Sequence, residues 1–251
     1  MSARRGVGLA EVLVTVALAG VVMAAASHGL AQHLRLRRAR DATARADEIV
    51  REVHVILRAE LGHAAGQIRV LGDTAVDLPS LRVLSRACEV SSTRLILSSS
   101  TSWWAAPRPG DSLAVLDTLT RTEWRTSVVA VGSQRASAAC PDGGTKLTLS
   151  AAPPPTVPAL LLPARIWRMM RYAAYRAADG TWWFGERNCV SSCGAVQPIA
   201  GPLLPPAQGG LRLSVVLDAH GRPRALDVSV RAAVSGRSAR LSARVPLADT
   251  P

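Results

Sequence analysis

The fold is decided by residues 4–33, RRGVGLAEVLVTVALAGVVMAAASHGLAQH. Thr15 is the only polar side chain between positions 12 and 26, and Leu9 and Ala10 extend the apolar run on the other side of Glu11. An α-helix needs about 20 apolar residues to cross roughly 30 Å of hydrocarbon. The stretch therefore predicts a membrane-spanning helix over residues 7–29. Because an ionisable group in such a helix is costly without a partner, Glu11 is a candidate functional residue.

The helical pattern continues beyond this apolar run. From residue 41 to 61, apolar side chains recur every three or four positions, at Ala42, Ala46, Ile49, Val50, Val53, Ile56, Leu57 and Leu61. This spacing predicts an amphipathic helix. No proline interrupts residues 7–66, so we expect one helix of about 55–60 residues that ends at Gly62 or Gly66. Its second half, residues 30–65, should pack on a globular head.

The head, residues 66–251, has the pattern of an antiparallel sheet, with short β-forming runs between Pro, Gly and Ser residues. We expect strands over residues 67–71, 94–98, 112–117, 124–131, 145–149, 166–174, 181–185, 211–217, 225–232 and 240–245. The proline-rich segments 151–163 and 201–210 are predicted loops, because proline provides no ladder donor. The predicted fold class is α+β, a long N-terminal helix packed on an antiparallel β-sheet head.

The chain is strongly basic, with 30 Lys and Arg against 18 Asp and Glu and a formal net charge of +12. Such a charge is compatible with nucleic acid or with an anionic membrane surface. The arginines are scattered, however, apart from a cluster at residues 35–40, and no nucleic-acid-binding motif is present. We interpret the charge as a solvated basic surface, with DNA contact as the minority alternative.

The four cysteines, Cys88, Cys140, Cys189 and Cys193, form an even set. In an exported domain this predicts up to two disulfides, with three connectivities open. One possibility is that Cys189 and Cys193 close a small loop, while Cys88 and Cys140 form a disulfide between positions further apart in the sequence. A zinc site is the alternative, but the spacing does not match paired C-x₂-C knuckles, so we expect disulfides and no metal.

No residue pattern indicates an enzyme. The five histidines, His28, His33, His54, His63 and His220, have no nearby carboxylate arrangement typical of a triad or a metal site. No G-x-S-x-G, P-loop or H-E-x-x-H motif occurs. Asp111, in a Pro-Gly-Asp sequence, is interpreted as a turn-forming carboxylate. We therefore predict no catalytic residue and no cofactor.

Residues 4–11 resemble the prepilin processing site of type IV pilins and pseudopilins. In that family a short basic leader ends in glycine, cleavage follows this glycine, the new first residue is N-methylated, and a glutamate lies at the fifth mature position. The resemblance implies a leader of residues 1–6 ending at Gly6, a processed N-terminus at Val7, and an assembly role for Glu11. Val7 and Gly8 depart from the family, which usually has an aromatic residue or Met and then a hydroxyl residue.

Three segments of the head are similar, more loosely, to large minor pilins and to the J-type pseudopilin of type II secretion. They are PGDSLAVL (109–116), RIWRMMRYAAYR (165–176) and LDAHGRPRALDVSV (217–230). The resemblance implies a structural subunit that a prepilin peptidase processes at the bacterial inner membrane. It would be single-pass, with its head in the periplasm or cell exterior. It would join other pilin or pseudopilin subunits as an initiating or tip component of a type IV pilus or a type II secretion pseudopilus.

Other interpretations remain open at this point. A signal peptide cut near residues 24–27 or a plain lipid anchor would explain the apolar run, but neither explains Gly6 and Glu11 at their spacing. The positive-inside rule would keep the head inside, because residues 35–40 carry four arginines. The processing motif and the cysteine count favour export, which we expect. The functional alternative is a membrane-anchored, exported binding protein for DNA or an extracellular ligand that does not polymerise.

Overall fold

The computed structural model describes residues 8–64, 68–98, 102–103, 105–116, 122–152, 162–189 and 193–247. These residues form one long helix, α1 (Leu9–Leu61), a short 3-10 helix, η1 (Pro206–Gln208), and an antiparallel system of thirteen strands. The strands are β1 (Arg69–Leu71), β2 (Ala75–Ser91), β3 (Arg94–Ser98), β4 (Ser102–Trp103), β5 (Ser112–Leu116), β6 (Glu123–Gln134), β7 (Gly144–Leu149), β8 (Leu162–Arg176), β9 (Trp182–Asn188), β10 (Gln197–Leu203), β11 (Leu211–Leu217), β12 (Pro223–Val234) and β13 (Arg237–Pro246). The predicted α+β class, with a long N-terminal helix and a large antiparallel sheet, is confirmed.

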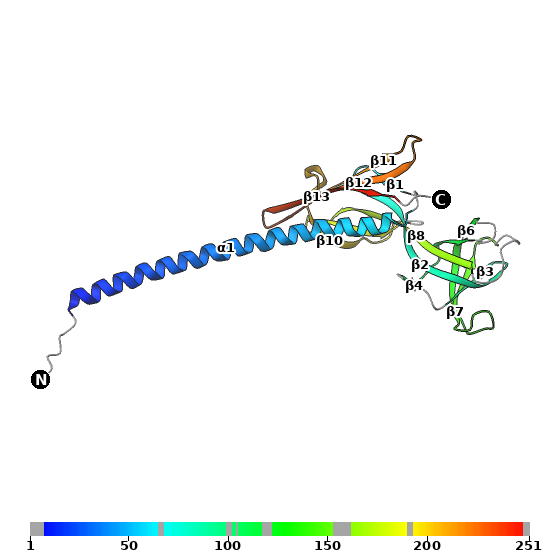
Figure 1. The fold of residues 1–251 in the computed structure, drawn as a ribbon, viewed down its shortest axis with the longest axis horizontal. Coiled ribbons are helices and arrows are strands. Elements are labelled where there is room, and N and C mark those ends of the chain that lie inside the picture. Colours follow the sequence, from blue (N-terminus) through cyan, green and yellow to red (C-terminus); the bar gives the residue numbers. More distant parts are fainter. Residues whose placement is uncertain are drawn as a thin grey trace.

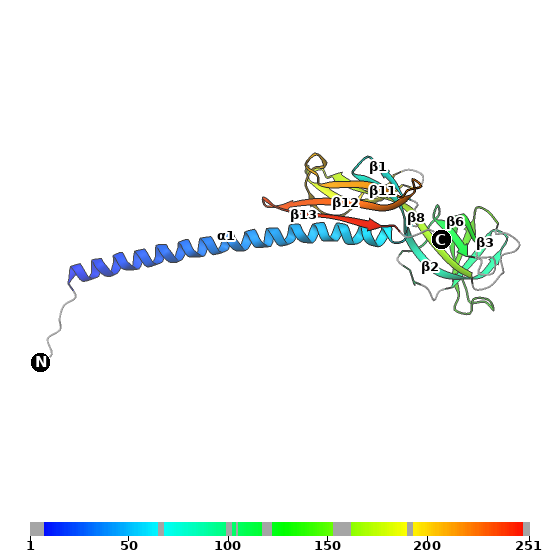
Figure 2. The same ribbon diagram turned by 45° about the horizontal axis from the view of Figure 1, so that its top comes forward.

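Helix α1 is unbroken for 53 residues and ends at Leu61, where the backbone N–H of Gly62 bonds to the carbonyl of Arg58 at 3.1 Å. Its second half buries the predicted apolar stripe, made of Ala42, Ala46, Ile49, Val50, Val53, Leu57 and Leu61. Strands β13, β12, β10 and β2 contact this half of the helix. The first half extends away from the head as a single rod (Figure 1), while β13 runs alongside the second half (Figure 2).

The core beneath the helix, here called the helix core, joins the α1 stripe to the inner faces of several strands. Tyr172 of β8 and Phe184 of β9 lie at its centre, with ring centroids 5.9 Å apart. Leu211 of β11 and Leu226 of β12 complete it from the other side. Burial of these side chains against Leu57 and Leu61 therefore anchors the helix to the head.

Six strands close a ring at the far end of the head, here called the barrel. The pairings run β2–β3–β7–β6–β5–β8, and β8 pairs again with β2. Its interior is filled by apolar side chains, namely Val83, Ala87, Leu95, Leu97, Leu113, Val115, Val128, Leu147, Leu149, Leu162, Ala164 and Ile166. Within the ring, each strand pairs with a neighbour on both sides, so the ring itself has no edge strand. The barrel lies beyond the C-terminal end of α1 (Figure 1).

Strands β2 and β8 connect the two cores. They pair from Ala75–Ala173 to Ala87–Leu162, through both halves of the head. On its other edge, β8 pairs first with β5 in the barrel and then with β9 beside the helix core. The two long strands, here called the ribbon, therefore belong to both cores at once.

Two proline-containing segments differ from the prediction. The predicted loop over 201–210 is wrong in part, because Gly201–Leu203 belong to β10 and 206–208 form η1. Strand β10 tolerates its prolines because its pairing with β9 has register shifts and its pairing with β12 is a single residue pair. Strand β2 was not predicted, because Pro79 interrupts its β-forming pattern. The described pairings on the outer edge of β2 stop at Asp77 and resume at Val83, so Pro79 lies where this edge is unpaired. Of the predicted loop 151–163, the last two residues begin β8, and 153–161 lie outside the described residues.

The packing of α1 on the head predicts a large difference between two aliphatic positions. Leu57 is fully buried, whereas Val55, two residues away, is 63% exposed. Leu57→Ala should lower the free energy of unfolding by about 2–5 kcal/mol, because it leaves a cavity in the helix core. Val55→Ala should change it by less than about 0.5 kcal/mol. Denaturant unfolding of the full chain in detergent measures both, and equal losses would contradict the described packing.

Candidate functional site on the exposed half of the helix

The apolar side chains in the first half of α1 are not covered by the head. Leu9 is 80% exposed and Met23 is 74% exposed, and the same holds for most apolar residues up to Leu36. Among the described residues, α1 is the one helix that is long and apolar enough to cross a membrane. An apolar surface of this extent is favourable only in lipid or against other apolar chains.

Glu11 lies in the first turn of α1 and is exposed. Its backbone carbonyl accepts a hydrogen bond from the Thr15 hydroxyl at 2.9 Å, and its backbone N–H donates to the carbonyl of Gly8 at 2.9 Å. The Ser27 hydroxyl also bonds within the helix, to the carbonyl of Met23. The neutral polar groups of this segment are therefore satisfied locally, as hydrocarbon requires. The Glu11 carboxylate has no partner among the described residues, and it lies at the helix end that favours negative charge.

A basic belt follows the apolar segment. It consists of Arg35, Arg37, Arg38 and Arg40, all exposed, immediately before the first buried residue of α1, Ala42. Long basic side chains at the end of a membrane-spanning helix can extend their charged groups toward water. The belt therefore lies between the part of the helix that suits lipid and the part that the head covers.

All four cysteines form disulfides. Cys88 of β2 bonds to Cys140, which precedes β7, with the Cα atoms 5.6 Å apart, and both residues are buried. Cys189 bonds to Cys193 just after β9, with the Cα atoms 4.1 Å apart. The first disulfide spans 52 positions in the sequence and ties the barrel together, whereas the second spans four and closes a small loop. In the described part of the chain, no three His, Cys, Asp or Glu side chains converge as a metal site.

Asp111 has a larger role than the turn predicted for it. One carboxylate oxygen accepts the backbone N–H of Arg108 at 2.8 Å, as expected for a turn. The other oxygen pairs with the guanidinium of Arg168 in β8, and both side chains are almost completely buried. The pair lies where β8 leaves β5 and begins to pair with β9. Arg168 was not identified from the sequence. Side chains alternate between the two faces of β8, and Arg168 occupies an inward-facing position where an apolar side chain would be expected.

A second polar group lies at the end of α1 in the head. The Glu60 carboxylate accepts hydrogen bonds from the hydroxyls of Ser80 and Tyr172. The Tyr172 hydroxyl also lies within hydrogen-bonding reach of Glu186 of β9, so its single proton is shared between the two carboxylates in turn. Burial is the largest influence on Glu60 and raises the pKa of its carboxyl group above the ordinary value, despite these hydrogen bonds. Burial likewise raises the pKa of Tyr172.

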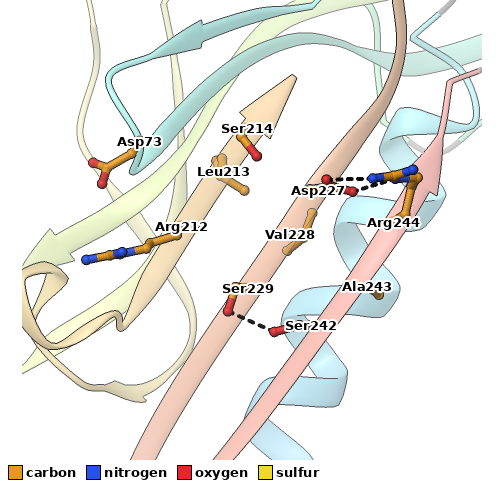
Figure 3. A pocket seen from close by; sticks show the side chains of 10 residues that line it. All are labelled: Asp73, Arg212, Leu213, Ser214, Asp227, Val228, Ser229, Ser242, Ala243 and Arg244. Atoms are coloured by element: carbon orange, nitrogen blue, oxygen red, sulfur yellow. Dashed lines mark hydrogen bonds and ion pairs between the residues drawn. The ribbon is translucent and has the colours of Figure 1, made fainter. Parts of the chain in front are cut away.

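A shallow groove of about 660 Å³ lies on the face of β11, β12 and β13 that points away from α1 (Figure 3). Its polar side chains pair across strands: Arg244 donates to Asp227 at 2.7 Å, and Ser229 and Ser242 are 3.0 Å apart. Hydrogen bonding from Arg244 lowers the pKa of Asp227. Exposed cross-strand pairs of this kind contribute little stability. They satisfy each other and present no convergent acid and base.

No protein-family model, curated protein or solved structure matches this chain. Of the residues singled out in the sequence, Glu11 lies at the tip of the exposed rod, and the cysteines lie in the head. Gly6 and Val7 lie outside the described residues.

The burial of Glu60 predicts a pH dependence of stability. Because its pKa is raised above 4.5 in the folded chain, the folded state binds this proton more tightly than the unfolded chain does. Its stabilising contribution is complete below pH 4.5 and is lost as the pH rises through the raised pKa. Glu60→Gln should remove this loss, so the variant should gain stability over the wild type toward neutral pH. Glu52→Gln, at an exposed position of the same helix, should retain the wild-type profile in denaturant unfolding.

Proposed function

We propose that this protein is a pilin-like assembly subunit. It is processed by a prepilin peptidase after Gly6 and anchored in the bacterial inner membrane with its head exported. From there it is incorporated as a minor, initiating or tip component of a type IV pilus or a type II secretion pseudopilus. The observation that carries the proposal is Glu11, whose carboxylate has no partner among the described residues and lies at the start of an uncovered apolar helix.

The chemistry of the N-terminus explains why a carboxylate is placed there. Cleavage after Gly6 creates a positively charged amine on Val7, four residues before Glu11 in the sequence. In hydrocarbon this amine requires a negative partner, which Glu11 of the same or a neighbouring subunit supplies. Pairing offsets part of the desolvation cost of both charges, and a mismatched register leaves them unpaired. The pair therefore selects one axial position for the incoming subunit.

The exposed face of the helix also suits packing against other helices. Ala17, Gly20 and Ala24 recur at spacings of three and four on one side of α1, and the space around Gly20 is open. Small residues at this spacing let helix backbones approach closely in a membrane or a bundle. A bundle of parallel helices would then cover the apolar surface that the head leaves exposed.

The shape of the head favours the end of a filament. The barrel projects beyond α1 along the helix axis (Figure 1). In a bundle of parallel, axially staggered subunits, a head that extends along the axis occupies the space where the next head would stack. An initiating or tip subunit has no such neighbour on its outer side. The extended head therefore favours a minor role over a bulk, repeating one.

Mass spectrometry of the mature N-terminus tests the processing step. Protein isolated from cells that contain a prepilin peptidase should begin at Val7 and carry one N-methyl group. Cells without the peptidase provide the control and should yield the unprocessed chain. A mature protein that begins at Met1 or Ser2, or that is cut near Ser27, would contradict the proposal and favour the non-polymerising, membrane-anchored binding protein.

Replacement of Glu11 tests the assembly step separately. Glu11→Ala should still insert in the membrane, but its content in sheared filaments should fall at least about tenfold, because one partner of a buried pair is lost. Thr15→Ala, one turn further along the same helix, removes only a hydroxyl bonded to its own backbone and should assemble normally. Equal filament content of Glu11→Ala and the wild type would exclude the charge-pair mechanism.

A further inference from the structure

A pocket in the head gathers four arginines from four different segments. It has a volume of about 320 Å³. Arg82 comes from β2, Arg108 from the turn before β5, Arg168 from β8 and Arg187 from β9. This arginine pocket lies beside the Asp111–Arg168 pair, where the barrel meets the helix core. Its volume is at the lower end of the range of about 300–1,000 Å³ typical of small-molecule sites.

Several N–H groups in the arginine pocket have no acceptor. Arg168 uses its Nε to bind Asp111, but its Nη2 is buried and has no hydrogen-bond partner among the described residues. The Nε atoms of Arg82 and Arg187 are likewise buried and unpaired within the described part of the chain. Buried donors are nearly always paired in native proteins, and leaving one unpaired is costly. The chain therefore supplies more donors here than acceptors.

The other contacts of these arginines leave their charge uncompensated. The Arg82 guanidinium donates through Nη2 to the Met170 sulfur at 3.7 Å, which is a weak acceptor. The Arg187 guanidinium lies over the Tyr175 ring, 5.5 Å from its centroid, which leaves the N–H edge available. Positive charges outnumber negative ones even when Asp111 is counted.

The acidic groups at the pocket are already engaged. Both oxygens of Asp111 are used, one by Arg168 and one by the Arg108 backbone. Glu186 also lines the pocket and lies within hydrogen-bonding reach of the Tyr172 hydroxyl. Among the described residues, no acceptor bonds to the three buried N–H groups, and an external anion would supply one.

We propose that the arginine pocket binds a tetrahedral oxyanion, a phosphate or sulfate group that is free or carried by a small molecule. Guanidinium groups form charge-assisted, often paired, hydrogen bonds with such oxygens. A planar carboxylate matches a single guanidinium fork, whereas a tetrahedral anion presents oxygens in several directions. Arginines that converge from four segments fit the second geometry. The inference concerns the head and is independent of how the helix assembles.

The small disulfide loop gives this pocket a fixed wall. Gly194 and Ala195 line it, directly after Cys193. The Gly194 N–H donates to the carbonyl of Asn188 at 2.8 Å, so the chain is held on both sides of the Cys189–Cys193 bond. A disulfide that closes so few residues contributes little by loop entropy. The bond instead holds in place the chain that lines this pocket together with Arg82 and Arg168.

Calorimetric titration of the full chain in detergent tests the proposal. Inorganic phosphate, at ionic strength held constant with potassium chloride, should bind saturably and raise the thermal midpoint. Arg187→Gln and Arg82→Gln should each weaken binding at least about tenfold, as expected for the loss of one charge-assisted hydrogen bond. Arg212→Gln removes an exposed arginine on the outer face of β11 and should bind like the wild type.

Two further measurements distinguish a free anion from one carried by a larger molecule and control for misfolding of the variants. Tighter binding of glycerol 3-phosphate than of inorganic phosphate would assign the site to a phosphate carried by a larger molecule, and equal binding to the free ion. Arg187→Lys keeps the charge but loses the fork, so it should bind between the wild type and Arg187→Gln. Absence of saturable phosphate binding by the wild type, or an equal loss in Arg212→Gln, would overturn the proposal.

Discussion

One unbroken helix carries two apolar surfaces that need different partners, and the rest of the structure depends on this constraint. From Ala42 to Leu61 the apolar stripe is buried beneath the strands of the head. From Leu9 to Leu36 the apolar side chains remain exposed. Because the backbone hydrogen bonds continue across the boundary, the head cannot move independently of the exposed half. Whatever fixes the position of Glu11 therefore also fixes the position of the head.

The head contains two cores that are joined without a flexible linker. The β2–β8 ribbon runs through both cores, so its residues pack under the helix at one end and inside the barrel at the other. The buried Asp111–Arg168 pair lies where the neighbours of β8 change. A pair buried this deeply is costly unless its hydrogen bonds are well made, and removing either partner would leave a buried charge. The Asp111–Arg168 pair therefore favours one arrangement of the two cores at their junction.

Several arginines of the head pair with carboxylates on the same or a nearby strand. Arg165 and Arg125 share Glu123 and flank the Trp167 ring. Arg171 pairs with Asp77 across the ribbon, as Arg244 pairs with Asp227 across β12 and β13. Apart from arginines scattered over the surface, three groups stand out: paired arginines on strands, the basic belt beside the apolar helix, and the arginine pocket. Of these groups, the pocket is the one whose described arginines combine buried N–H groups with no hydrogen-bond partner.

The sequence by itself determined the long helix, the apolar stripe and most of the strands, because each follows from spacing within a few residues. It placed the end of the helix at Gly62 or Gly66, and it predicted disulfides but left three cysteine pairings open. Tertiary structure alone decided the closure of the barrel, the proline-containing strands β2 and β10, and the arginine pocket. Asp111 and Arg168 are 57 positions apart, and the pocket collects residues from Arg82 to Gln197. Contacts over such separations depend on strand pairing and register, which no local pattern encodes.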